Sequence, residues 1–543
     1  MLHCALLLLS PLLQAEAPPP YGYAPPEDLP ETLTAIAADG GAELVEYGHS
    51  PEGRPLLALT FGRSTAPGRP EVLLVGNLDG ARLGATEVLV GLCRRFAESG
   101  SPLLDAATVH VVPLANPDAA ARAFRGADPW RGGPVDEDHD GLMDEDGPTD
   151  LDGDGLALWL KVPDPVGRWR TDERDPRALV EADAAAGEAG GFRRLREGDD
   201  RDGDREYGED PPGGEDLDAN FPHRWPQYRP EGGPYPLSAP EARALADFVL
   251  AHRHLALVVV LDDDDAFEKV PKGADRVDRD ATRPLQDDRE VLVVWSKRFR
   301  DLREADAGEG RPALPAPRGG ADERGRFGEW AYFQAGVPVI ESALWSPPLD
   351  RAPESAPELE KDAPDELKLL RWNDVAYDGA GFRTWRRLDH PSLGPVEVGG
   401  WLPLVLDNPP ASDLPRLTAL WGDFLDDLSG DFATLEWVDV ETTPLGSGVF
   451  EARATLVNRG LLATTSAMGV RSRRPLPVRV VLELPQGGEL LAGRRLQSVE
   501  RLEGLGGHRE FRWVYRLPES GAAALRATSQ CAGEAIAELE AER

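Results

Sequence analysis

The segment from residue 71 to residue 87 constrains the fold more than any other part of the sequence. Its apolar run at 72–75 predicts a short buried strand, and the apolar spacing at 85–96 is that of a helix. A strand, a loop and a helix in this order are typical of an open α/β sheet, in which loops at the carboxyl ends of strands form the ligand site. The charged loop residues Asp79 and Arg82 therefore belong to a candidate site.

Other apolar runs extend this pattern on both sides. Short runs of strand type alternate with segments of helical spacing, and the last predicted helix and strand of this series lie within residues 327–340. Together they predict a mixed α/β sheet that is flanked by helices. The further predicted strands are 43–47, 56–61, 108–113 and 256–261, and the further predicted helices are 29–38, 238–252 with Ser238 as N-cap, 292–299 and 413–428.

Four short motifs in this frame resemble those of the zinc carboxypeptidases, the family of carboxypeptidase A. G-N-L-D-G-A-R at 76–82 is similar to the G-N-x-H-G-x-E loop that supplies two zinc ligands, and N-P-D at 116–118 is similar to N-P-D-G. D-L-D-A-N-F-P at 216–222 is similar to D-L-N-R-N-F-P, and G-V-P-V-I-E-S-A at 336–343 is similar to G-x-P-x-F-T-x-E. The resemblance covers residues 25–410 and implies removal of C-terminal residues from peptides, or cleavage of peptide-like bonds in cell-wall material.

All three zinc-ligand positions that the resemblance implies are substituted in this chain. Asp79 stands where the family has a histidine, Arg82 where it has a glutamate, and Asp262 where it has the second histidine. Two imidazoles and a carboxylate hold a catalytic zinc so that its bound water loses a proton near neutral pH. We expect Arg82 to take the place of the metal, with its guanidinium forked between Asp79 and Asp262.

The positions of the general base and of the carboxylate clamp are substituted as well. The resemblance places the base at Ala343, and Glu341, two residues earlier on the same face of the strand, is the other candidate for that role. The family's Asn-Arg clamp has become Asp218 and Ala219, so we expect a substrate carboxylate to be repelled there. Arg131 is the one catalytic residue that the resemblance leaves in place.

Residues 128–218 form an insertion that is more acidic than the rest of the chain. They contain 11 basic and 29 acidic residues, and their sparse apolar pattern predicts little core of their own. Aspartates alternate in three stretches, as in the calcium loops of EF-hand and thrombospondin type 3 repeats, and we expect structural calcium there rather than a solvated acidic loop. The candidate calcium ligands are Asp136, Asp138, Asp140, Asp144, Asp146, Asp150, Asp152, Asp154, Asp200, Asp202 and Asp204.

The charge and the two ends of the chain restrict its partners and its location. The net charge of −37 argues against nucleic acid and anionic membranes as partners. Residues 1–17 resemble a secretory signal and are too short to span a membrane, so we expect a secreted or periplasmic protein. The expected domains are a carboxypeptidase-like domain at 22–410, a linker helix at 411–431 and a β-sandwich at 432–543.

These patterns predict a catalytically inactive member of the family, a pseudoenzyme that binds a peptide or a similar ligand in the old cleft. Two alternatives stay open. An active metallocarboxypeptidase would use an altered metal site made of Asp79, Asp262 and a neighbour such as Asp263, with Glu341 as base. A calcium-stabilised extracellular scaffold would use the β-sandwich for adhesion.

Overall fold

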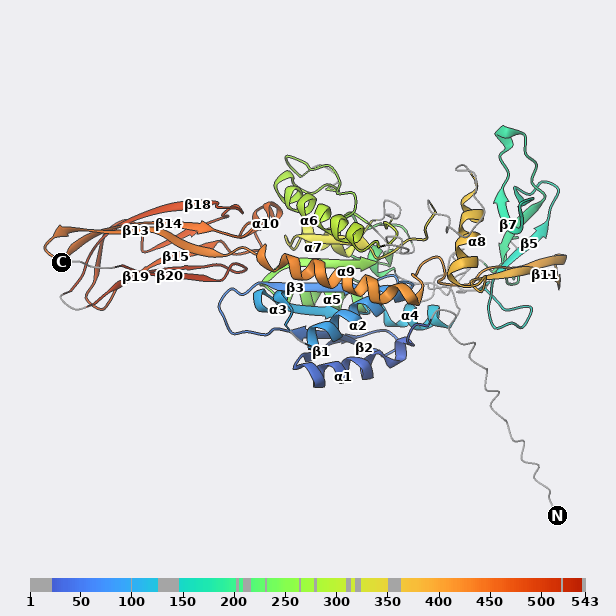
Figure 1. Ribbon diagram of the computed structural model, residues 1–543, viewed down its shortest axis with the longest axis horizontal. Helices are drawn as coiled ribbons and strands as arrows, with labels where there is room; N and C mark the ends of the chain where they lie inside the picture. The colour runs from blue at the N-terminus through green and yellow to red at the C-terminus, as the bar shows by residue number, and fades with distance from the viewer. Residues whose placement is uncertain are drawn as a thin grey trace, which may run out of the picture.

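The computed structural model shows three regions that follow one another along the long axis of the molecule (Figure 1). An α/β region lies in the middle, a β-sandwich lies at one end, and a second sheet with its helix lies at the other. No helix in the described part of the chain is long and apolar enough to cross a membrane. The described residues are 22–98, 100–125, 146–201, 205–208, 216–229, 232–262, 265–277, 281–308, 314–317, 324–349, 363–518 and 521–539.

A six-stranded sheet of order β1-β2-β4-β3-β9-β10 forms the middle region. The strands β4, β3, β9 and β10 are parallel, whereas β1 and β2 pair antiparallel at one edge. The predicted mixed sheet is thus confirmed. Its strands are β1 (Glu43–His49), β2 (Pro55–Phe61), β3 (Glu71–Gly76), β4 (Thr108–Val112), β9 (Leu255–Asp262) and β10 (Val339–Ala343).

Side chains of β3 alternate between the two faces of the sheet, which is why helices cover both. Val72 and Leu74 join one apolar core, together with residues of α1, α2, α6 and α9, and Leu73 and Val75 join another, together with residues of α5 and α7. The apolar run that predicted a buried strand is therefore buried on both sides. The helices are α1 (Leu29–Gly40), α2 (Leu83–Glu98), α5 (Pro240–Ala251), α6 (Gln286–Ala305), α7 (Phe327–Phe333) and α9 (Leu414–Asp427).

Helix α5 begins later than the sequence predicted. The predicted N-cap was Ser238, but the helix begins at Pro240 with Ala239 in the N-cap position. The hydroxyl of Ser238 accepts a hydrogen bond from Asn220 Nδ2 at 2.8 Å. Ser238 therefore does not cap α5. It binds Asn220 and stabilises the loop that follows Asp218.

The insertion contains more structure than its composition predicted. Four of its segments are strands, which join two later strands in an antiparallel sheet of order β11-β12-β5-β8-β6-β7. Leu160, Val162 and Leu195 alternate with charged residues. They are buried in the apolar core that also contains Val72 and Leu74. The insertion is thus more regular than its composition suggested, because one apolar face, buried in that core, is enough to hold a sheet. The strands are β5 (Trp159–Pro163), β6 (Trp169–Asp172), β7 (Asp175–Glu181), β8 (Phe192–Arg196), β11 (Phe382–His390) and β12 (Gly394–Trp401).

Two four-stranded antiparallel sheets form the C-terminal region, in agreement with the predicted sandwich. Their strand orders are β13-β14-β18-β16 and β17-β15-β19-β20. Alternate residues from both sheets, among them Trp513, Tyr515 and Leu525, make one apolar core between them. The strands are β13 (Leu435–Gly446), β14 (Val449–Asn458), β15 (Val478–Glu483), β16 (Glu489–Ala492), β17 (Leu496–Val499), β18 (His508–Arg516), β19 (Ala523–Thr528) and β20 (Glu534–Leu539).

The short helix α10 (Ala467–Ser472) of the C-terminal region docks against the α/β region. The backbone N–H groups of Ala467 and Met468 donate to the carboxylate of Asp288 at 2.7 and 3.0 Å. The hydroxyl of Tyr332, on α7, donates to the same carboxylate at 2.8 Å. Asp288 therefore joins α6, α7 and α10 at one buried point.

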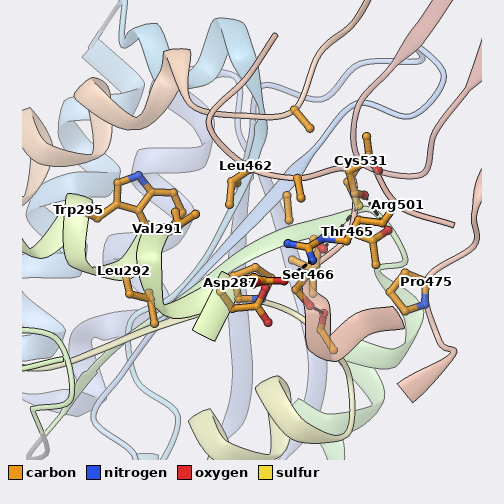
Figure 2. A pocket seen from close by; sticks show the side chains of 18 residues that line it. Asp287, Val291, Leu292, Trp295, Leu462, Thr465, Ser466, Pro475, Arg501 and Cys531 are labelled. Carbon is orange, nitrogen blue, oxygen red and sulfur yellow. Dashed lines mark hydrogen bonds and ion pairs between the residues drawn. The ribbon is translucent and has the colours of Figure 1, made fainter. Parts of the chain in front are cut away.

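A second contact between the C-terminal region and the α/β region brings the backbone before α10 close to the backbone at Gly336. Ser466 Oγ donates to the carbonyl of Gly336 at 2.7 Å. Gly336 has a φ of 73°, and a Cβ there would lie 2.7 Å from the Cα of Gly469, so only glycine permits this approach. A small cavity of about 50 Å³ remains between the regions, where Arg501 lies 3.1 Å from Asp287 (Figure 2).

Candidate functional site

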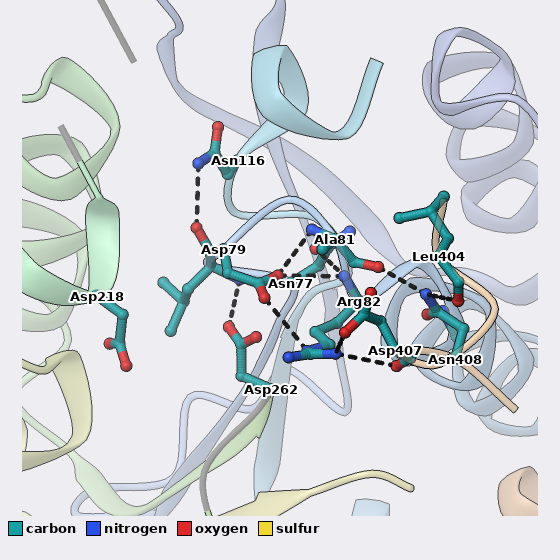
Figure 3. Close-up of polar contacts among 12 residues, drawn as sticks. Asn77, Asp79, Ala81, Arg82, Asn116, Asp218, Asp262, Leu404, Asp407 and Asn408 are labelled. Atoms are coloured by element: carbon teal, nitrogen blue, oxygen red, sulfur yellow. Dashed lines mark hydrogen bonds and ion pairs between the residues drawn. The ribbon is translucent and has the colours of Figure 1, made fainter. Parts of the chain in front are cut away.

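The loop after β3 folds around the carboxylate of Asp79. Asp79 is 4% exposed, and its Oδ1 accepts hydrogen bonds from the backbone N–H groups of Ala81 and Arg82 at 2.7 and 3.1 Å. Asn77, with a φ of 58°, turns the chain at the end of the strand, and its Oδ1 accepts a further bond from the N–H of Arg82 at 2.9 Å. The loop therefore holds Arg82 beside Asp79 (Figure 3).

The guanidinium of Arg82 joins two carboxylates. Its Nε lies 3.2 Å from Asp79 Oδ2, and its Nη1 lies 2.7 Å from Asp407 Oδ1. Asp407 belongs to the segment between β12 and α9, and its neighbour Asn408 accepts a bond from the N–H of Gly84 at 2.8 Å. The expected contact of Arg82 with Asp79 is present, and Asp407 is a further carboxylate partner that the sequence did not mark.

Asp262 lies at the same edge of the sheet as Asp79. It ends β9, which pairs with β3, and it is 3% exposed. Its Oδ2 accepts a hydrogen bond from the N–H of Leu78 at 2.5 Å. The two acidic positions therefore come together as expected, and Asp262 secures the Asp79 loop through its backbone.

The former clamp position forms a buried ionic group with the weak base candidate. Asp218 accepts hydrogen bonds from Arg326 Nε at 3.0 Å and from the N–H of Phe327 at 2.8 Å. Arg326 Nη2 lies 3.3 Å from Glu341 Oε1, and the side chains of all three ionic residues are at most 10% exposed. The guanidinium of Arg326 offsets part of the charge of Asp218, and the expectation that a substrate carboxylate is repelled there stays a prediction.

Ala343, the predicted base position, ends β10 opposite Asp262 in the register and is buried. Its methyl group has no atom that accepts a proton. Ala219, the second clamp position, is also buried, and its carbonyl carbon would lie 2.7 Å from a Cβ at Gly325. These two positions add packing but no charge to the site.

A cavity of about 220 Å³ opens beside this ionic group. Arg326 and Glu341 line it together with a second ion pair, in which Arg224 Nη1 lies 2.7 Å from Glu329 Oε1. Helix α7 passes close enough that a Cβ at Gly328 would lie 2.7 Å from Glu341 Oε1, so a larger residue there would displace the carboxylate of Glu341. The apolar part of the lining comes from Ala266, Pro271, Pro284, Leu292, Tyr332, Phe333 and Val339.

Comparison with known sequences identifies the α/β region. The model of the zinc carboxypeptidase family matches residues 33–265, which carry the Asp79 loop, Asp218 and Asp262. Residues 33–265 therefore form a domain of the zinc carboxypeptidase family. A second model, that of a domain of unknown function (DUF8731), matches residues 434–540, which form the β-sandwich next to the carboxypeptidase domain.

Carboxypeptidases of mammals are among the relatives of this domain. Carboxypeptidase D of Rattus norvegicus is 38% identical over 125 residues, which cover 18% of this chain and 9% of that protein. Carboxypeptidase Z of Mus musculus is 32% identical over 115 residues, which cover 18% of this chain and 17% of that protein. The chain thus spans less than a fifth of the length of either relative.

Solved structures also align with this chain, at low sequence identity. Thrombin activatable fibrinolysis inhibitor is 13% identical, with 60% of this chain and 68% of that chain covered and a TM-score of 0.38. Carboxypeptidase A of Helicoverpa armigera is 14% identical, with 66% of this chain and 73% of that chain covered and a TM-score of 0.38.

The residues of this carboxypeptidase domain do not fit a zinc ion. Zinc needs several imidazole, thiolate or carboxylate ligands that converge on one point. At the three family positions, Asp79 is bound to two N–H groups and a guanidinium, Asp262 is bound to a backbone N–H, and Arg82 is itself a cation. Within the described ranges, one group of three potential metal-ligating side chains converges on a point, and this group lies in the insertion. Asp263 and Asp264 lie outside those ranges.

That group consists of Asp150, Asp152 and Glu197, whose ligand oxygens lie within 4.8 Å of one another. Asp150 accepts bonds from the N–H groups of Gly153 and Gly155 at 2.7 and 2.8 Å, so it closes a tight acidic turn. Glu197 is fully buried, and burial raises the pKa of its carboxyl group.

The remaining calcium candidates are spread around this turn or lie outside the described part of the chain. Asp154 and Asp152 form ion pairs with Arg386 of β11. Asp146 accepts a bond from the N–H of Arg201 at 2.8 Å, and Asp200 precedes that residue. Asp136, Asp138, Asp140, Asp144, Asp202, Asp204 and the catalytic candidate Arg131 lie outside the described residues.

Sequence reasoning missed four charged residues of the site. Arg326 is the N-cap residue of α7 and Glu329 lies in its first turn, and a glutamate within the apolar segment FGEWAYF was a signal that this helix faces a polar group. Arg224 and Asp407 lie in loops without a local pattern, so no signal distinguished them from surface charges.

Proposed function

We propose that this carboxypeptidase domain is a catalytically inactive, exported member of its family that binds a peptide or a similar ligand in its former cleft. The observation that carries the proposal is the guanidinium of Arg82, which lies at a zinc-ligand position and joins Asp79 to Asp407. The positive charge of Arg82 repels a zinc ion at this place. It also occupies Asp79, the carboxylate that would bind the zinc.

The other polar groups of the cleft support the same conclusion. Asp218 and Glu341 are bound to Arg326, and the base position Ala343 has no proton acceptor. Ion pairs that are buried in this way preserve the shape of the cleft without zinc. The cavity beside them offers aromatic walls and two ion pairs, which suit a peptide side chain.

An active metallocarboxypeptidase is the alternative reading of the same residues. It would need Arg82 to leave both Asp79 and Asp407, so that Asp79, Asp262 and a neighbour could hold the metal with Glu341 as base. Three buried or half-buried contacts would have to break for this change.

Zinc content and hydrolysis test the proposal together. Protein expressed with zinc and calcium available and then desalted is expected to contain no zinc and to leave a panel of C-terminally free and blocked peptides intact. About one zinc per chain with cleavage of the free peptides would contradict the proposal. The matched variant Asp79→His, Arg82→Glu, Asp262→His restores the ligand set, and zinc uptake by this variant alone would attribute the loss to these positions.

Ligand binding requires its own measurement. The same peptides are expected to bind to the wild-type protein in calorimetric titrations without being cleaved. Binding should weaken at least tenfold in Phe333→Ala, which removes one aromatic wall of the cavity. The control Tyr228→Ala removes an aromatic ring that is 92% exposed and does not line the cavity, and it should bind like the wild type. No binding of any peptide would contradict the ligand-binding part of the proposal.

The insertion supports a second proposed role, that of a structural calcium site. Its support is the convergence of Asp150, Asp152 and Glu197, because a bound cation would offset the burial of Glu197. Calcium is expected to raise the melting temperature of the wild-type protein but not of Glu197→Gln. Asp389→Asn, which removes a carboxylate that is 76% exposed, should respond like the wild type. An equal response of all three proteins, or of none, would contradict this site.

A further inference from the structure

The strand β17 lies at an edge of the β-sandwich, where backbone groups face away from the sheet. In the described part of the chain, its one strand partner is β15. The N–H of Leu482, on β15, donates to the carbonyl of Arg495 at 2.9 Å. Backbone groups of successive residues in an antiparallel strand point to opposite sides, so those of Leu496 and Ser498 point away from the sheet. Such an edge is a template for the addition of another strand.

Two side chains of opposite charge flank the outward-facing residues of β17. Arg494 precedes the strand and Glu500 follows it, and both are exposed. Neither forms an ion pair with the described residues of the chain. Between them, Leu496 is 50% exposed and Ser498 is exposed as well. Alternate residues share one face of a strand, so these four side chains form a row, which we call the β17 edge.

The β17 edge is complementary to a second copy of itself. In an antiparallel pair with a two-fold axis at Gln497, Arg494 of each copy stands directly opposite Glu500 of the other. Leu496 then stands opposite Ser498, and the outward backbone groups of both copies meet in a regular ladder of hydrogen bonds. Opposite charges at directly opposite positions stabilise a strand pair, and the symmetry supplies this contact twice.

Shifted registers of the same pair lose this match. With the axis at Ser498, Arg495 stands opposite Arg501 of the other copy, and like charges at opposite positions destabilise a sheet. With the axis at Leu496, Arg494 stands opposite Ser498 and has no carboxylate partner there. The charges therefore select a single register.

The other edge strands of the sandwich, β13, β16 and β20, do not complement themselves. Every charged residue within their bounds is acidic, so two copies of any one of them would repel each other. The residues are Glu436, Asp439, Glu441, Glu489, Glu534 and Glu538.

The charge distribution of the whole molecule also favours contact through the sandwich. Residues 432–543 contain 14 basic and 14 acidic residues, whereas the whole chain has a net charge of −37. The sheet of the acidic insertion lies at the other end of the molecule (Figure 1). Two copies that meet at their sandwiches therefore avoid most of the repulsion that keeps strongly charged proteins apart.

We propose that two copies of this chain associate through the β17 edge, so that a sheet of one sandwich continues into the same sheet of the other. Main-chain hydrogen bonds between the two strands supply affinity, and the paired charges set the register. The contact involves no residue of the former cleft, so it forms whether or not that cleft binds a ligand.

Sedimentation velocity of the full chain over a series of concentrations measures this association. The wild type is expected to shift from monomer to dimer as the concentration rises. Arg494→Glu and Glu500→Arg should each raise the dissociation constant at least tenfold, because each change replaces two attractive contacts with two repulsive ones. The double variant Arg494→Glu, Glu500→Arg should dimerise like the wild type, and an equal mixture of the two single variants should form a mixed dimer.

Ser498→Pro tests the pairing of the backbones separately. Proline is tolerated in an edge strand where the N–H faces solvent, so this variant should keep its fold but lose at least tenfold in dimer affinity. The control Arg509→Glu makes the same charge change at an exposed position of β18, which is not an edge strand, and should dimerise like the wild type. Thermal melting of each variant verifies the fold.

Four outcomes would each overturn the proposal. They are a wild type that stays monomeric at every concentration, equal dissociation constants for the wild type and Arg494→Glu, a folded double variant that does not dimerise, and a dimer that Ser498→Pro leaves intact.

Discussion

Replacing Arg326 with alanine is expected to lower the free energy of unfolding by about 3–5 kcal/mol. Arg326 balances Asp218 and lies 3.3 Å from Glu341, and its side chain is only 4% exposed. Its removal leaves two acidic groups in the protein interior without their common cation. Urea unfolding at neutral pH, followed by tryptophan fluorescence, measures the loss.

A compensated variant separates charge from packing at this position. In Arg326→Met with Asp218→Asn and Glu341→Gln, the chain keeps similar volumes but no buried charge. At least half of the lost stability should return, because neutral groups are less costly to bury. A single Arg326→Ala variant that loses less than about 1 kcal/mol would show that solvent already balances these carboxylates.

Replacing Arg82 with alanine is expected to cost about 3 kcal/mol of stability. The carboxylate of Asp79, whose side chain is 5% exposed, then loses its cation, and Asp407 loses the contact that ties its segment to the Asp79 loop. The effect should be smaller than that of Arg326, because Asp407 is 42% exposed and water can replace its partner.

The matched control for Arg82 is an arginine whose ion pair is on the surface. Arg125 lies 2.6 Å from Glu27, with the two side chains 63% and 39% exposed. Arg125→Ala should cost less than about 1 kcal/mol. Equal losses for Arg82→Ala and Arg125→Ala in chemical unfolding would refute the view that Arg82 holds the site together as a metal would.

The order of strands and helices in the carboxypeptidase domain could be read from the sequence because its apolar runs are long and uniform. Strands such as β3 and β9 are buried on both faces, so nearly every residue in them is apolar. Strands of the insertion gave no such signal. In β6 and β8, apolar residues are outnumbered by arginine, aspartate and threonine, and one buried face was enough to fold them.

The sequence predicted only those parts of the candidate site whose positions follow from the order of strands in the sheet. Asp79 and Asp262 follow neighbouring parallel strands, and such positions meet at one edge of a sheet whatever the rest of the chain does. The charged residues that complete the site were not predictable in this way. Asp407 and Arg326 come from segments that are distant in sequence from the Asp79 loop. The spacing of residues within a motif does not predict contacts between such segments.

The joint at Asp288 gives the C-terminal region a mechanical link to the cavity. Tyr332 contributes to the cavity wall at its ring, while its hydroxyl binds the carboxylate that receives the N–H groups of α10. A tilt of the sandwich would therefore pull on α7 and reshape the space beside Glu341. Conversely, a ligand that fills this cavity would act through Tyr332 and Asp288 on the orientation of the β-sandwich.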